Sequence, residues 1–519
     1  MTTLRQGRVE TKLPGSAESD VADGIAEKEM PPGQVIEDIG MGPAQVFTFL
    51  LSAGGIWMCD GMEITVITVV TLAAAHDLGV SGMYRGLLST SAFAGLVVGI
   101  AVSGRIGDTL GRKVPIVYSF AAVALLGLTT AVLPSFWGII LFRALLGFGM
   151  GFGMPPALAM VSETTPAEWR IPMRSATNIF FQAAGIATCV IAGLEDPTLK
   201  EVNWRRLMAI ITLPTACCGL LAHLFLLESP VFLASIGRHA EAERVFHWMS
   251  VVNGRPCKYN IAGFSEKKQL QGVLTFWEQM SIIFGKRYRY VTIAAMYGCF
   301  FINVVHYGHT YAIVQVTGKT TSMPAAWLSI LTSCFAIVAS LIGGVVFQQL
   351  PRKEAACSSL VLALMSVCCF SYAGSIPTPR SRFNELMFEL GVMGIPTAWQ
   401  LGAIVFGQIA VEIYPPNASA TGGSFVIGVG RIGTVMSPML FEAAQRFTRD
   451  WATFYYLLAV LSAIGVLLLA AAPSIKAFSE IEDAPANDAD DVAEGQAAKT
   501  LMMQPGYGSL AAGKKSSMV

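Results

Sequence analysis

Two carboxylates and one arginine, all in apolar stretches, are the residues of this chain best suited to chemistry. Asp60 and Glu63 lie three residues apart in the apolar stretch 45–74, and Arg143 lies in the stretch 136–159. A spacing of three places two side chains on one helix face, so the carboxylates can share a cavity. Neighbouring carboxylates repel each other, which favours proton binding by one of them. We expect Asp60 and Glu63 to couple a proton, with Arg143 as counter-ion.

The same three residues fit two other roles. A static ion pair between Arg143 and one of the acids would hold two helices together without any proton transfer. One of the acids could also contact a solute directly. Charges with strongly altered proton affinity occur both at functional sites and in structural ion pairs, so the sequence leaves these alternatives open.

A polar patch in the apolar stretch 290–316 suits solute binding. Asn303, His306 and Tyr307 are spaced to lie on one helix face, where they can line a cavity. A histidine at this depth can also carry a proton, because its charge changes near neutral pH. The alternative is that His306 or His309 only forms a hydrogen bond to a neighbouring helix.

Four further polar or aromatic residues complete the expected solute site. Asn178 and Gln182 can bind a solute through their amides, or they can join two helices. Trp399, followed by Gln400, can stack on an organic cation or a ring, although core packing fits it equally well. For Arg431 we expect a structural position near a helix end, with its side chain reaching the membrane surface.

The composition places these side chains in a membrane protein. Of the 519 residues, 53% are hydrophobic and only 13% are charged, which is about half the charged fraction of a soluble domain. The formal net charge is zero, so no overall field attracts nucleic acid. A helix needs roughly 20 apolar residues to cross a bilayer. We find twelve such stretches, at 45–74, 86–106, 114–133, 136–159, 175–194, 207–227, 290–316, 326–348, 355–374, 386–410, 418–441 and 453–473.

The twelve stretches form two groups of six, in 44–227 and 290–473, separated by the basic segment 228–289. We therefore predict an all-α, polytopic membrane protein built from two related halves. Lysine and arginine in the even-numbered connections, such as Arg170 and Arg174 after the fourth stretch, place those connections, the segment 228–289 and both tails in the cytosol. The polar tails, 1–43 and 474–519, cannot bury enough apolar surface to fold, so we expect them to be disordered.

A loop motif occurs once in each half. The first copy contains Gly104, Asp108, Gly111, Arg112 and Lys113, and the second contains Gly344, Gln348, Pro351, Arg352 and Lys353 with the same spacing. In the first copy, the second glycine allows the tight turn that brings the basic pair to the membrane face. We interpret the motif as an internal repeat that acts in gating.

This loop resembles the hallmark loop of the major facilitator superfamily. Other motifs are also similar to those of the superfamily: Arg143, Gly147, Gly149 and Glu163, then Glu228, Ser229 and Pro230, then Tyr414, Pro415 and Arg431. The segment from Trp57 to Glu63 most resembles the synaptic-vesicle-protein-related branch. The resemblance covers nearly the whole membrane portion. It implies twelve helices in two six-helix bundles around a central cavity.

The resemblance also implies roles for single residues. In related proton symporters, acids of the first span and an arginine of the fourth couple protons, which corresponds here to Asp60, Glu63 and Arg143. The second loop copy departs from the family pattern, because Gln348 and Pro351 replace an acid and a glycine. Gating should therefore depend mainly on the first copy.

These observations predict a secondary active transporter of a small polar organic solute, with an organic ion as the preferred class and protons as the coupling ion. The sequence lacks a G-x-x-x-x-G-K-[ST] loop and the paired cysteine spacing of a zinc site. We therefore expect no enzyme activity, no cofactor and no metal. We also expect a monomer in the plasma membrane or in an endosomal or vesicle membrane. The alternative is a non-transporting receptor, sensor or vesicle protein with the same fold.

Overall fold

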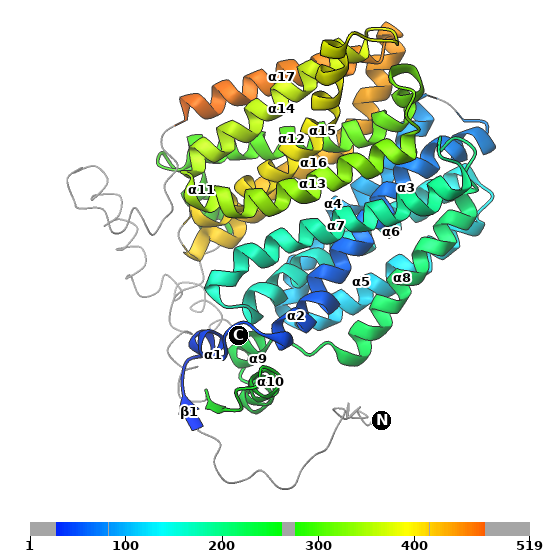
Figure 1. Ribbon diagram of the computed structural model, residues 1–519. Coiled ribbons are helices and arrows are strands. Elements are labelled where there is room, and N and C mark those ends of the chain that lie inside the picture. The colour runs from blue at the N-terminus through cyan, green and yellow to red at the C-terminus, as the bar shows by residue number, and fades with distance from the viewer. Residues whose placement is uncertain (1–26, 81, 262–275, 415, 473–519) are drawn as a thin grey trace, which may run out of the picture.

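The computed structural model describes the chain outside residues 1–26, 81, 262–275, 415 and 473–519. In the described part, twelve helical segments are long and apolar enough to cross a membrane (Figure 1), which confirms the twelve predicted stretches. The first span combines α2 (Pro43–Phe49), the π-helix η1 (Leu50–Gly54) and α3 (Gly55–Asp77). The next five are α4 (Met83–Leu110), α5 (Lys113–Val132), α6 (Phe136–Thr164), α7 (Ala167–Glu195) and α8 (Trp204–Phe225). The last six are α12 (Arg289–Thr320), α13 (Ala325–Gln349), α14 (Arg352–Gly374), α15 (Arg382–Glu412), α16 (Pro416–Thr448) and α17 (Ala452–Ala471).

The spans form two neighbouring bundles, one from the first six and one from the last six (Figure 1). Helices α3, α4 and α7 of the first half contact α12, α16 and α13 of the second half, respectively. This arrangement confirms the predicted division into two halves. A site between these helix pairs would be built by both halves at once.

Small residues allow the helices to pack closely within the first half. A Cβ atom added to Gly147 of α6 would lie 1.9 Å from the carbonyl oxygen of Ala92 in α4. A Cβ atom on Gly95 of α4 would likewise lie 1.8 Å from the carbonyl oxygen of Ala144 in α6. Any side chain at these positions would push the two backbones apart, so the glycines set the distance between α4 and α6.

Outside the spans, the chain forms a small domain from two distant segments. Strands β1 (Glu27–Glu29) and β2 (Lys258–Asn260) pair in parallel, next to α1 (Pro32–Ile39), α9 (Pro230–Ser235) and α10 (His239–Val252). Another short helix, α11 (Phe276–Ile283), contacts α16.

The small domain corrects one expectation. Residues 27–43 were predicted to be disordered, yet they carry β1 and α1. Val35, Ile36 and Ile39 of α1 are buried in the same apolar cluster as Phe246 of α10. One short apolar face is enough here because the segment 228–289 supplies a matching surface, which the composition of the tail alone does not reveal. The rest of both tails lies outside the described residues.

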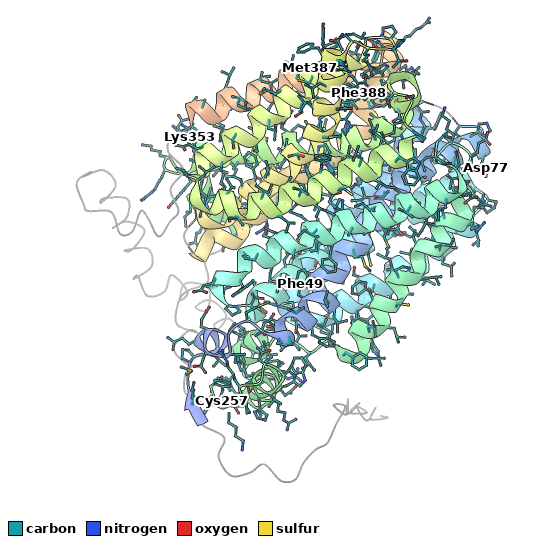
Figure 2. The ribbon with its side chains drawn as sticks, viewed as in Figure 1. Phe49, Asp77, Cys257, Lys353, Met387 and Phe388 are labelled. Atoms are coloured by element: carbon teal, nitrogen blue, oxygen red, sulfur yellow. The ribbon has the colours of Figure 1, made fainter. Side chains whose placement is uncertain are left out.

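The bundle therefore has two distinct ends. Figure 2 shows Cys257 of the small domain and Lys353 at the start of α14 toward one end, and Asp77 at the end of α3 toward the other. We call the end that carries the small domain the domain end, and the opposite end, with Asp77, the far end.

Candidate functional site

A pocket of about 160 Å³ lies between the two halves of the bundle. Helices α3, α6 and α7 line it from the first half, and α12, α15 and α16 line it from the second. Its charged lining residues are Asp60, Arg174 and Arg431. Its aromatic lining residues are Trp57, Phe181, Tyr307, Trp399 and Phe406. A polar pocket shared by both halves is the feature of this fold best placed to hold a solute.

Asp60 contributes the carboxylate of this pocket. Its side chain is buried, and its Oδ1 atom has no hydrogen-bond partner among the described residues. The carboxylate interacts electrostatically with Arg431 across the pocket and with Glu63 on its own helix. The π-helix η1 precedes this part of the first span, and π-helical turns are frequent next to functional sites. A buried carboxylate that lacks a full set of partners is suited to binding a proton.

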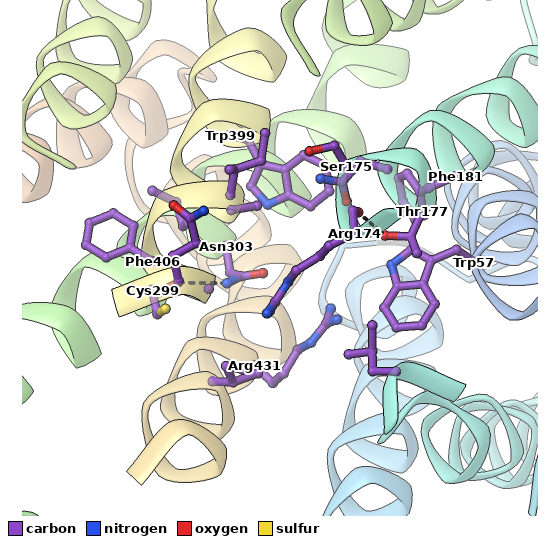
Figure 3. Close-up of a pocket in the computed structure, with 18 of the residues that line it drawn as sticks. Trp57, Arg174, Ser175, Thr177, Phe181, Cys299, Asn303, Trp399, Phe406 and Arg431 are labelled. Atoms are coloured by element: carbon purple, nitrogen blue, oxygen red, sulfur yellow. Dashed lines mark hydrogen bonds between the residues drawn. The ribbon is translucent and has the colours of Figure 1, made fainter. Parts of the chain in front are cut away.

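Arg431 lies in the pocket, which corrects the expectation that it would reach the membrane surface near a helix end. Its Nη1 atom donates a hydrogen bond to the hydroxyl oxygen of Tyr307 at 3.0 Å. Figure 3 shows its side chain extending into the pocket from α16, while Arg174 extends toward the same space from α7. The residue lies well inside the long helix α16, so its side chain is closer to the pocket than to a helix end.

Glu63 does not share the pocket with Asp60, contrary to expectation. Its Oε2 atom accepts a hydrogen bond from Arg143 Nη1 at 3.1 Å, and both side chains are buried. Arg143 Nη2 also contacts the sulfur of Met208 at 3.3 Å. Residues three apart on a helix differ by about 60° in direction, which is enough to turn Asp60 toward α16 and Glu63 toward α6. This geometry fits the alternative that Glu63 and Arg143 form a structural pair.

The expected solute-binding residues divide into two groups. Asn178, Asn303, Tyr307 and Trp399 line the pocket, while Gln182, His306 and Gln400 are absent from its lining. The ring of His306 stacks on the indole of Trp399, with ring centres 3.8 Å apart and ring planes within 10°. Gln182 and Gln400 are buried, and at least one amide atom of each lacks a hydrogen-bond partner in the described part of the chain. His306 therefore lies behind Trp399 in the pocket wall, whereas Gln182 and Gln400 are buried outside the lining.

Sequence reasoning missed Trp57, Arg174 and Gln408, which also line the pocket. Arg174 belongs to a connection whose basic residues predict the orientation of the chain, and the sequence indicated no other role for it. A usable signal was present, because Arg174, Asn178 and Phe181 are spaced four and three apart, as expected for one helix face.

The first gating loop is tied to two acids at the domain end. Arg112 Nη2 pairs with Glu163 Oε1 at 2.9 Å, and the backbone N–H of Arg112 donates to Glu228 Oε1 at 2.7 Å. Gly111 has a φ of +95°, and a Cβ atom there would lie 2.2 Å from Glu228 Oε2. Burial raises the pKa of Glu228, although hydrogen bonds from the backbone N–H groups of Ser229, Arg112 and Lys113 oppose this shift. Asp108 and Gly104 lie in α4, but the side chain of Asp108 is not among those that the structure describes.

The second gating loop makes different contacts. Lys353 Nζ donates to the carbonyl oxygens of Ala470 at 2.9 Å and Ala472 at 2.5 Å, at the end of α17. Pro351 precedes Arg352, which begins α14. Positions Gly344 and Gln348 are outside the described side chains. Lysine at a helix C-terminus stabilises the exposed carbonyls there, a structural role.

At the far end, a buried cluster joins the two halves. Arg85 of α4 forms two hydrogen bonds to Glu442 of α16, at 2.8 and 3.0 Å, and Tyr311 of α12 donates to Glu442 Oε1 at 2.6 Å. The Glu442 side chain is only 2% exposed. Charge-assisted bonds of this length are among the stronger polar contacts in proteins. The far end is therefore held closed in this conformation.

Comparisons with known proteins agree with this architecture. The family model described as Major Facilitator Superfamily matches residues 46–438. The chain is similar to putative transporter svop-1 of Caenorhabditis elegans, with 22% identity over 81% of this chain and 81% of that protein. It also resembles synaptic vesicle glycoprotein 2B of Mus musculus, with 28% identity over 45% of this chain and 35% of that protein. The inward open conformation of the xylose transporter XylE from E. coli has a TM-score of 0.65, at 15% identity over 85% of this chain and 99% of that one.

Proposed function

The chain belongs to the major facilitator superfamily, and from that membership we propose that it moves a small polar organic solute across the membrane by alternating access. The observation that carries this proposal is the pocket with Asp60, Arg174 and Arg431 at the junction of the two halves. Charged side chains inside a membrane cost several kcal/mol, roughly 2.5–3.5 on insertion scales, so they are retained for a function.

In one conformation of a transporter that works by alternating access, the pocket is accessible from one end of the bundle. The far end is pinned by Arg85 and Glu442, whereas Arg174 lies about two turns from the start of α7 at the domain end. We infer that this conformation exposes the pocket toward the domain end. The basic connections support a cytosolic position for that end and for both tails.

We propose that protons drive the movement, with Asp60 as the coupling residue. Protonation would remove the charge of a buried carboxylate that has few partners, and release of the proton would restore its attraction to Arg431. The Glu63–Arg143 pair would then position the first span rather than carry the proton. An organic ion is the preferred solute because charged and aromatic side chains line the same pocket.

A flux experiment tests this function. The purified full chain in liposomes that contain a pH-sensitive dye would be exposed to a panel of organic anions, organic cations and sugars. We expect at least one organic ion to cause proton influx, and Asp60→Asn to abolish that influx while the protein still folds. Absence of flux for the whole panel would contradict transport. Unchanged proton influx in Asp60→Asn would contradict the coupling role.

One observation favours a second candidate, a receptor, sensor or vesicle component of the same fold. The second gating loop contains Pro351 in place of a glycine, and Lys353 binds the end of α17. Such a protein would bind the solute without moving it, so binding without flux in the same liposomes would support this candidate.

We propose a monomer in the plasma membrane or in an endosomal or vesicle membrane, and the similarity to a synaptic vesicle glycoprotein supports the vesicle location.

A further inference from the structure

Most of the charged side chains described in the lining of the central pocket are positive. Among the described residues, Arg174 and Arg431 are positive and Asp60 is negative. These three side chains sum to one positive charge when Asp60 is ionised and to two when Asp60 is protonated. Figure 3 shows both guanidinium groups in the middle of the pocket, between Trp57 on one side and Asn303 on the other. Two cations that share a buried space favour an anion between them.

The remaining walls suit a flat apolar group. Trp57, Phe181, Trp399 and Phe406 come from three different helices and face the same space. One face of the Trp399 indole is covered by His306, which fixes the orientation of the ring. The volume of about 160 Å³ is close to the roughly 150 Å³ of a cavity known to hold one benzene molecule. The pocket thus fits a solute about the size of one ring with a small substituent.

A second pocket, of about 400 Å³, lies at the far end and has the same sign of charge. Among the described residues, Lys200, Lys319 and Arg85 line it together with one acid, Glu201. Because Arg85 is already paired with Glu442, the excess of positive charge in this pocket comes mainly from the two lysines. A recess lined by one sign of charge raises the local concentration of oppositely charged solutes. This pocket could therefore collect anions on the far side when the far end opens.

We infer that the transported solute is an organic anion with one ring-sized apolar part, whose anionic group binds between Arg174 and Arg431. This inference rests on the proposed transport function and narrows its solute class. The aromatic walls would hold the ring, and Asn178 and Asn303 would donate to or accept from polar substituents.

The same geometry couples the anion to a proton. Asp60 interacts with Arg431 of α16, with Tyr307 of α12 and with Glu63 of its own helix, and Arg174 of α7 lines the same pocket. Ionised Asp60 competes with the solute for Arg431, whereas a proton on Asp60 removes that competition. One proton and one anion would therefore bind together, and no covalent bond would form or break.

The inference is tested with three probes of matched shape and different charge. Benzenesulfonate is an anion at any usable pH, benzenesulfonamide is neutral, and phenyltrimethylammonium is a cation. We expect benzenesulfonate alone to raise the thermal unfolding midpoint of the purified full chain, more strongly at mildly acidic than at mildly basic pH. In Asp60→Asn, benzenesulfonate should bind equally at both pH values. Equal binding of all three probes, or of none, would overturn the inference.

Substitution of the arginines locates the anion. Arg174→Gln and Arg431→Gln should each weaken benzenesulfonate binding by about 10-fold or more, because a charge-assisted contact is lost. Arg431→Lys keeps the positive charge and should retain part of the affinity. This result would show that the weaker binding of Arg431→Gln comes from the lost charge and not from misfolding. Arg206→Gln is the matched control, since Arg206 is exposed at the start of α8. Unchanged affinity in both pocket variants would overturn the assignment.

Flux of the same probes separates this inference from the proposed function. Uptake of phenyltrimethylammonium but not of benzenesulfonate would overturn the anion class and would support transport. Specific binding of benzenesulfonate without uptake of any probe would support the anion site and would contradict transport.

Discussion

At the scale of single residues, two acids three positions apart have different surroundings. Asp60 faces the shared pocket, and its Oδ1 atom has no hydrogen-bond partner in the described part of the chain, whereas Glu63 is paired with Arg143 at 3.1 Å. The sequence identified both acids as important because charges are costly in a membrane. The sequence could not show which of the two acids pairs with Arg143. The two side chains differ by about 60° in direction around the helix axis, and this difference decides which neighbouring helix each acid meets.

The Glu63–Arg143 pair gives a prediction about stability. Glu63→Gln should leave the Arg143 charge buried without its counter-ion and lower stability by about 3–5 kcal/mol, as for other broken buried pairs. The double variant Glu63→Gln with Arg143→Gln should recover much of this loss. Thermal unfolding in detergent measures both effects, with Asp60→Asn as the matched control, which should not lose stability. A double variant no more stable than Glu63→Gln would contradict a structural pair.

The sequence did not predict that Arg174 and Arg431 line the pocket. Arg431 was expected near a surface because arginines at helix ends reach outward, and Arg174 was counted only as an orientation signal. Arg174 immediately precedes the predicted stretch 175–194, but α7 begins at Ala167, so Arg174 lies inside the helix. For Arg174 the error is therefore the predicted end of an element. Arg431 lies inside the predicted stretch 418–441, so for Arg431 the error is the direction of its side chain, which depends on the neighbouring helices.

At the scale of elements, the first gating loop depends on one backbone conformation. Gly111 has φ +95°, and the Glu228 carboxylate lies against it and accepts from the N–H groups of Arg112 and Lys113. The sequence predicted the tight turn correctly. It did not identify Glu228 as the group that holds the turn, because the acid follows more than a hundred residues later.

Gly111→Ala should therefore disturb both the turn and its anchor. Gly111 combines φ +95° with ψ −179°, a region almost restricted to glycine, so we expect a strain of about 1–3 kcal/mol. This strain and the displacement of Glu228 should together slow uptake. Gly237→Ala is the matched control, since Gly237 has φ +79° and nothing within 4 Å of an added Cβ atom. Initial uptake rates of the two variants in liposomes provide the comparison. Equal rates in both would show that the Glu228 contact has no part in gating.

The small domain is an element that the sequence did not predict. Asp38 accepts a hydrogen bond from Lys28 Nζ at 2.7 Å, which joins α1 to β1, and one from the Tyr259 hydroxyl at 2.9 Å, which joins α1 to β2. The side-chain hydrogen bond from Lys28 is the main cause that lowers the pKa of Asp38. A carboxyl group whose pKa is lower in the folded state stabilises that state above its unfolded pKa and loses this effect as the pH falls through the folded value.

Acidification should therefore loosen the small domain. Below about pH 4, where the free aspartate pKa lies, the β1 and α1 amides should lose protection against hydrogen exchange, measured relative to the intrinsic rate at the same pH. Asp38→Asn should show fast exchange already at neutral pH. Glu241→Gln, which removes an exposed partner of Arg238 in α10, is the control and should leave exchange near the normal rate. Equal exchange in Asp38→Asn and the normal chain would contradict the proposed link.

At the scale of the whole molecule, the fold was predictable and the conformation was not. Twelve apolar stretches and the repeated loop were enough to predict two six-helix halves, because the length of a membrane span is set by the bilayer. The contacts between halves depend on residues such as Arg85, Glu442 and Tyr311, which are far apart in sequence. Their pairing depends on tertiary packing, so no local pattern identifies it.

The far-end cluster predicts a shift between conformations. Arg85→Gln would leave Glu442 buried without its main partner, so the closed far end should become less stable, by an amount on the order of 3–5 kcal/mol. The distance between spin labels at Lys200 and Lys319, which lie in different halves at the far end, should then increase. Arg206→Gln, an exposed change in the same region, should leave the distance unchanged. An unchanged distance in Arg85→Gln would contradict a role of this cluster in closing the far end.

We propose that one proton on Asp60 drives one organic anion through the pocket. The accumulation of labelled benzenesulfonate in liposomes under an imposed inward proton gradient measures this coupling. We predict accumulation above the external concentration with the normal chain, and only equilibration with Asp60→Asn. Accumulation to the same level in both, or none beyond that of protein-free liposomes in either, would contradict the claim.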